Sequence, residues 1–266
     1  MDGFEIMRTN ALSLTLATFV AGIFGFFLRW LQNLNGFNEQ GLSVPGASTT
    51  AVFTVYTLAV VLAFLLEERF IFKKLSRSAS ASQALASTGF VIRALSWVIA
   101  AVTVLGCLIF MFSSDFARYP NMQRITSVLG IFSGLCLPFI FGGKDEKEGG
   151  YGSVAALIPV LFGCLWLITA YRIESENPVR WSYIPAMLGI AALLVAFYYI
   201  AAYFYGKAKP ARCIFSLQLA SYLCIITLID GHTLAETLLF GAGAGVCLCF
   251  LYTLLRNAVK DQTQTP

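Results

Sequence analysis

Long apolar runs separated by short polar connectors are the dominant pattern along this chain. Eight runs contain no acidic residue and come close to the about 20 residues that an α-helix needs to cross a hydrocarbon core of about 30 Å. The pattern predicts transmembrane helices at Asn10–Leu28, Ala47–Leu66, Ala94–Phe112, Ile125–Gly143, Ser153–Tyr171, Trp181–Gly206, Cys213–Ile229 and Thr237–Leu255. Because the connectors are too short to hold a soluble domain, we expect an all-α, eight-span helical bundle over residues 1–266.

Composition leads to the same conclusion. Hydrophobic residues make up 58% of the chain and charged residues only 12%, whereas soluble domains have about 45–50% and about 25%. The mean hydropathy is +0.76. Charged residues are therefore too few to cover the surface in water, which excludes a soluble globule and makes the lipid bilayer the main partner.

Basic residues gather on one side of the predicted spans. The side of the chain ends would carry 13 of the 18 Lys and Arg, namely Arg8, Arg69, Lys73, Lys74, Arg77, Arg93, Lys144, Lys147, Lys207, Lys209, Arg212, Arg256 and Lys260. The opposite side would carry Arg29, Arg118, Arg124, Arg172 and Arg180. The positive-inside rule then predicts that both termini lie in the cytoplasm. We expect the protein in the plasma (inner) membrane. The mild net charge of +4 does not imply nucleic acid as a partner.

Several chemistries lack the residues that they need. The seven cysteines lie in or beside apolar runs, where free Cys behaves as a small hydrophobe, so we expect no disulfide framework. The single histidine excludes a His-Glu-x-x-His metalloprotease site, and the chain contains neither a P-loop nor a pair of intramembrane Asp residues. We therefore predict a non-enzymatic protein without a cofactor.

Residues near the turn before the last span allow two interpretations. His232 and Glu236 would lie one helical turn apart, which is half of a metal or proton-handling site. Alternatively, Asp230 is the N-cap of the last helix and Glu236 stabilises its first turn. Since two or three ligands are too few for a metal ion, no metal site is predicted.

Five charged residues are candidates for ligand binding. Arg93, at the start of the third span, either anchors the helix at the interface or contacts an anion or substrate. Arg29, Glu174, Arg180 and Glu236 lie in the outer connectors, which are either solvated loops or a recognition surface.

Two further patterns concern lipid contact and packing. The connector Glu67–Arg93 begins with charged residues, as expected of a stop-transfer anchor with a linker, or of a segment that contacts anionic lipid or a protein partner. Small residues recur at a spacing of four, as they do where helices pack closely within a chain or between copies. They are Ala17, Ala21 and Gly25 in the first span, Gly130 and Gly134 in the fourth, and Gly241 and Gly245 in the eighth.

The span layout, the outer loop Gly41–Gly46 and the outer step from Glu176 to Pro178 resemble uncharacterised multi-pass membrane proteins of Gram-positive bacteria. That resemblance covers layout only and implies no activity, so no residue gains a role from it. We predict an accessory or sensing role in the membrane, with a membrane or cytoplasmic protein partner. The alternative is a transporter or channel for a small solute, with Arg93 and the outer loops along the path.

Overall fold

The computed structural model describes residues 11–38, 42, 44, 46–75, 80–86, 89–113, 120–142, 150–174 and 183–258. Eight helices in these ranges are long and apolar enough to cross a membrane, which confirms an all-α polytopic bundle. They are α2 (Ala11–Asn35), α3 (Ser48–Leu66), α5 (Phe90–Phe112), α6 (Pro120–Gly142), α7 (Tyr151–Glu174), α8 (Ile184–Phe204), α9 (Pro210–Thr227) and α10 (Leu234–Arg256). A helix satisfies its backbone hydrogen bonds internally, so it is the form in which such apolar runs cross lipid.

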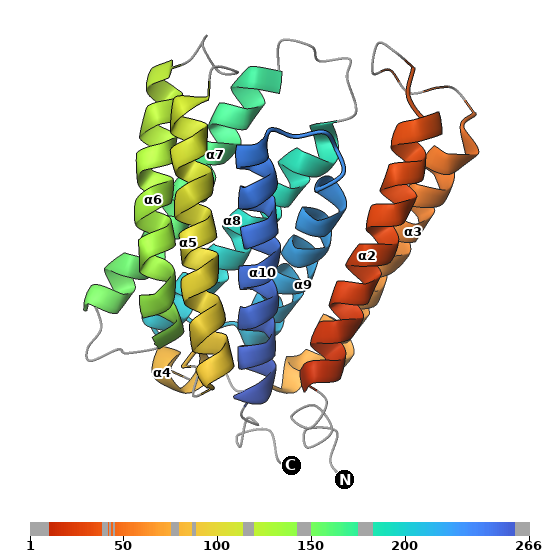
Figure 1. Ribbon diagram of the computed structural model, residues 1–266. Helices are drawn as coiled ribbons and strands as arrows, with labels where there is room; N and C mark the ends of the chain where they lie inside the picture. Colours follow the sequence, from red (N-terminus) through yellow and green to blue (C-terminus); the bar gives the residue numbers. More distant parts are fainter. Residues whose placement is uncertain are drawn as a thin grey trace.

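Helices α5 to α10 form a closed set in which each packs against the next and α10 returns to α5. Helix α2 packs against α9 and α10, and α3 packs mainly against α2, so these two helices form a hairpin at the side of the other six (Figure 1). We call α2 and α3 the hairpin and α5 to α10 the core. In an apolar stretch of 18 residues, 72% of the residues of α9 are buried inside the bundle. In the corresponding stretch of α3 and the turn that continues it, only 11% are buried.

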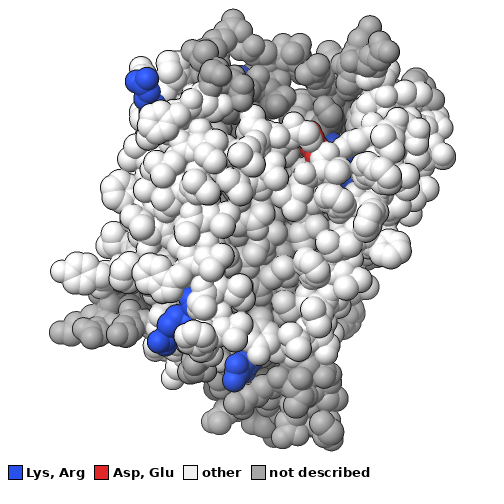
Figure 2. Space-filling model, viewed as in Figure 1, with Lys and Arg blue, Asp and Glu red and all other residues white. Residues whose placement is uncertain are grey.

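The charge distribution agrees with a bundle that lipid surrounds. The face in Figure 2 is almost free of described charged residues across its middle, and blue Lys and Arg side chains lie toward its two ends. Large apolar side chains such as Phe24, Val55 and Phe139 are exposed on the outer faces of their helices. Helix α2 begins and helix α10 ends at the same end of the bundle (Figure 1), which we call the termini end; the other is the opposite end.

Glycines explain the close approach of some helices. A Cβ atom on Gly25 would lie 2.8 Å from Ile226 Cγ2 and 2.9 Å from the ring of Tyr222, so α2 meets α9 with no room for a side chain. Gly134 meets α5 in the same way, and its Cβ would lie 3.0 Å from Val104. Gly241 does not have the predicted packing role within the chain, because a Cβ atom added there would meet none of the described atoms within 4 Å.

The predicted turn between the last two spans is confirmed. Gly231 has a φ of +69°, a conformation that glycine adopts without strain, and it links antiparallel α9 and α10. The expectation that Asp230 caps α10 is wrong: Thr233 is the N-cap, and it forms a capping box with Glu236. The Thr233 hydroxyl accepts a hydrogen bond from the Glu236 N–H, while the Glu236 carboxylate accepts one from the Thr233 N–H.

Replacing Thr233 with Ala should therefore destabilise the protein by about 1 kcal/mol, because a backbone donor in the first turn loses its acceptor. Unfolding in mixed detergent and dodecyl sulfate micelles measures this loss. Thr237→Ala is the matched control, since its hydroxyl only bonds back to the Thr233 carbonyl within the helix. An equal loss in both variants would contradict the capping role.

Candidate functional site

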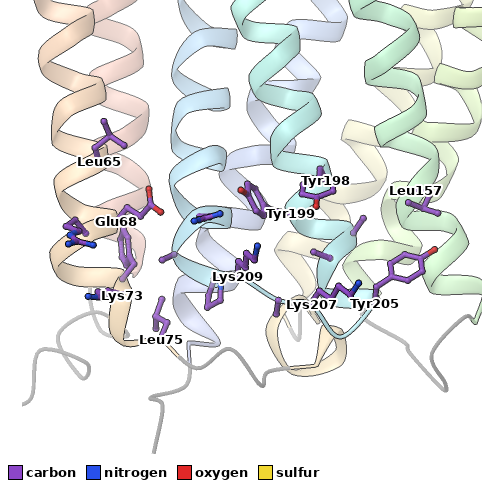
Figure 3. Close-up of a pocket in the computed structure, with 18 residues that line it drawn as sticks. Leu65, Glu68, Lys73, Leu75, Leu157, Tyr198, Tyr199, Tyr205, Lys207 and Lys209 are labelled. Carbon is purple, nitrogen blue, oxygen red and sulfur yellow. The ribbon is translucent and has the colours of Figure 1, made fainter. Parts of the chain in front are cut away.

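A broad groove lies at the termini end, where the hairpin meets the core (Figure 3). Its volume is about 1240 Å³, larger than the about 300–1,000 Å³ of pockets that hold drug-sized ligands. One wall comes from the end of α3 and the turns that follow it, and the other comes from α7, the end of α8 and the start of α9. The lining residues are Leu65, Glu68, Arg69, Phe72, Lys73, Leu75, Leu157, Tyr198, Tyr199, Ala201, Ala202, Tyr205, Lys207, Ala208, Lys209, Pro210, Ala211 and Arg212.

A change of helix type shapes the hairpin wall. Helix α3 continues into a π-helical turn, Glu67–Ile71, in which the Phe72 N–H bonds to the Glu67 carbonyl, and then into a 3₁₀ turn, Phe72–Lys74. Glu67 also accepts a 2.6 Å hydrogen bond from the Gln218 amide of α9, which ties this segment to the core. Because a π turn holds more residues than an α turn, it shifts the side chains that follow it. In this segment Phe72 becomes fully buried, and Arg69 and Lys73 line the groove.

The core wall owes its shape to the connection between α8 and α9. Gly206, at φ +64°, ends α8, and the Lys207 N–H bonds back to the Ala202 carbonyl at 2.9 Å. Helix α9 then begins at Pro210, and the side chain of its N-cap residue, Lys209, makes no capping hydrogen bond. The positive end of its dipole therefore adjoins the groove, which Ala211 and Arg212 of that turn line.

Electrostatically, the groove is strongly positive. Its lining contains five basic residues, Arg69, Lys73, Lys207, Lys209 and Arg212, and one acidic residue, Glu68. All five basic side chains are exposed. Within the described ranges, none of them forms an ion pair with a carboxylate. The site can therefore attract an anion without first breaking an internal ion pair.

Tyrosines and apolar side chains line the remainder of the groove. Tyr198, Tyr199 and Tyr205 come from α8 and the residue that follows it, while Leu65 and Leu157 lie on opposite walls (Figure 3). Tyrosine has an apolar ring and a polar hydroxyl, so it is favoured at the depth where acyl chains meet headgroups. This combination of exposed cations, tyrosines and leucines suits a molecule with an anionic head and an apolar tail.

A second polar cluster joins the hairpin to the core at the opposite end. The Arg29 guanidinium donates to the Asp230 carboxylate at 2.6 Å, and the two side chains are only 2% and 5% exposed. Asn33 donates to the same Asp230 oxygen at 3.0 Å, and Arg29 also donates to Gln32 at 2.7 Å. The guanidinium carbon lies 5.6 Å from the centre of the Phe53 ring on α3. Arg29 therefore holds α2 against the turn between α9 and α10.

Two predicted ligand-binding residues, and the histidine considered as half of a metal site, lie away from the groove. Arg93 is exposed in the first turn of α5 and does not line the groove. Glu236 belongs to the capping box, and His232 Nδ1 lies 3.7 Å from its carboxylate. In the described part of the chain, no three His, Cys, Asp or Glu side chains gather closely enough to hold a metal ion.

Two other predicted residues cannot be placed in a site. Helix α7 ends at Glu174, whose side chain lies outside the described residues, as does Arg180. Sequence reasoning missed the groove as a unit, because its two walls come from segments more than 80 residues apart. The available signal was the basic excess at the termini end, together with the tyrosines at the end of α8.

No protein-family model, curated protein or solved structure matches this chain, so the geometry of the groove carries the functional argument.

Proposed function

We propose that this integral membrane protein binds an anionic phospholipid in the groove, and that this binding serves an accessory or sensing role rather than catalysis. The observation that carries the proposal is the set of five basic side chains, free of ion pairs to described residues, in a groove with tyrosine and leucine walls. A phosphate would lie among the cations while the acyl chains contact the leucines. Basic pockets between membrane helices recognise lipid headgroups by this chemistry.

The proposed orientation follows from charge. We infer that the termini end is cytoplasmic, because basic residues mark the cytoplasmic side. We further propose that the membrane is the plasma (inner) membrane. The groove would then face the inner leaflet, whose surface is anionic. We also propose that the protein is related to the uncharacterised multi-pass membrane proteins of Gram-positive bacteria. Since Arg93 does not line the groove, the alternative of small-solute transport gains no support from this site.

The test is a titration of purified protein in neutral detergent with phosphatidylglycerol and, separately, with phosphatidylcholine, read by native mass spectrometry. Wild type should bind phosphatidylglycerol more tightly. Neutralising two cations in Lys207→Gln/Lys209→Gln should weaken that binding by roughly 30-fold, because each cation near an anionic surface contributes about 1 kcal/mol.

Arg93→Gln/Arg256→Gln is the matched control. It removes the same charge from the same end, from two exposed residues that do not line the groove. This variant should weaken binding by less than about threefold. Equal losses in the two variants, or equal affinity of wild type for the two lipids, would refute a lipid site in the groove.

A further inference from the structure

The cations of the groove stand on two separate walls. Arg69 and Lys73 belong to the turns after α3, whereas Lys207, Lys209 and Arg212 belong to the α8–α9 connection and the start of α9. Figure 3 shows Lys73 on the hairpin side of Leu75 and both Lys207 and Lys209 on its other side. One phosphate can approach either group, and two phosphates, one beside each wall, would engage both.

The charge balance of the groove favours a ligand with two phosphates over a ligand with one. Five basic residues and Glu68 leave an excess of four positive charges in the lining, whereas a phosphodiester lipid with a neutral headgroup substituent brings one negative charge. A lipid with two phosphodiesters neutralises twice as much, and it places one charge near each wall. Because neither wall's cations are ion-paired with described residues, both can contribute.

The apolar part of the lining is divided in the same way. Leu65, 42% exposed, flanks the hairpin wall, while Leu157 and Tyr198, 39% and 58% exposed, flank the core wall. Acyl chains attached to two phosphates would therefore find an apolar surface beside each group of cations. The volume of about 1240 Å³ also exceeds what drug-sized ligands need.

We infer that the groove is specific for a diphosphatidyl phospholipid, in which two phosphodiesters are joined by a glycerol and carry four acyl chains. The hairpin wall would hold one phosphate and the core wall the other. This inference rests on the proposed function and adds the class of lipid to it. Linking two binding groups makes the second contact intramolecular, which raises affinity without any new kind of contact.

The experiment compares cardiolipin with phosphatidylglycerol on wild-type protein in neutral detergent, with native mass spectrometry to count bound lipids. Cardiolipin should bind roughly 100-fold more tightly per phosphate, because its phosphates are linked. Each cardiolipin should displace two phosphatidylglycerol molecules. Cardiolipin within about threefold of phosphatidylglycerol per phosphate would overturn the inference and leave the proposed function intact. Failure of both lipids to bind would overturn both.

Neutralising one wall gives a second, independent measurement. Arg69→Gln/Lys73→Gln should lower the number of bound phosphatidylglycerol molecules from two to one and remove most of the advantage of cardiolipin. The charge-conserving variant Arg69→Lys/Lys73→Arg should still bind two phosphatidylglycerol molecules and should still bind cardiolipin more tightly. This control distinguishes the loss of charge from a loss of folding. A neutralised variant that still binds cardiolipin with full affinity would overturn the two-wall arrangement.

Discussion

Arg29→Met is expected to destabilise the protein by about 3–5 kcal/mol, because it leaves the Asp230 carboxylate buried without its cation. The side chain of Asp230 is 5% exposed. Its remaining hydrogen bond from a side chain would come from Asn33, and its Oδ2 atom has no hydrogen-bond partner among the described residues. Methionine keeps the length of the arginine stem, so the change removes charge and hydrogen bonds more than volume. Unfolding in mixed detergent and dodecyl sulfate micelles measures the loss.

The control is the double variant Arg29→Met/Asp230→Asn. It removes both charges while the amide can still accept the hydrogen bond from Asn33. Since replacing both members of a buried pair costs far less than removing one, the double variant should lie within about 2 kcal/mol of wild type. A double variant no more stable than Arg29→Met would show that the two side chains are not energetically coupled.

Gly25→Leu is the second substitution with a large expected effect. A Cβ atom added at this position would lie 2.8 Å from Ile226 and 2.9 Å from Tyr222, so a leucine side chain would push α2 away from α9. Overpacking costs about 1–3 kcal/mol. The displacement should also strain the 2.9 Å hydrogen bond between Tyr222 and Thr57 and weaken the Arg29–Asp230 contact, which joins the same helix to the core. We therefore expect a loss at the upper end of that range.

Gly241→Leu is the matched control for this prediction. It is the same substitution in the interior of another membrane helix, α10, but a Cβ added to Gly241 would meet no described atom within 4 Å. The free energy of unfolding should stay unchanged or rise by up to about 1 kcal/mol, because leucine has a higher helix propensity than glycine. The same unfolding measurement applies to both variants. Similar losses in both would mean that contact with α9 is not what makes Gly25 intolerant of a side chain.

Hydrophobic patterning located all eight long helices but not all of their ends. The first span was expected to end at Leu28, whereas α2 continues to Asn35 and brings Arg29, Gln32 and Asn33 onto the helix. Those residues are polar, so a hydropathy run stops before them. Their helical conformation is supported by contacts with Asp230 and Thr50, which are distant in sequence.

The spacing of small residues also failed to predict which of them pack against another helix. Gly25 and Gly241 occur in similar spacing patterns, yet only Gly25 lies against another helix. The pattern is a property of one helix, whereas the contact depends on which neighbour packs against that face. Tertiary packing alone separates the two cases.

The sequence by itself determined that this protein is an all-α membrane bundle, because apolar runs of this length are stable only as helices surrounded by lipid. It also revealed the basic excess at the termini end, since charges are costly to carry across a membrane. Only the tertiary structure decided that cations from two distant segments share one groove and that Asp230 pairs with Arg29. Both arrangements depend on how the hairpin packs against the core, and that geometry is absent from any single helix.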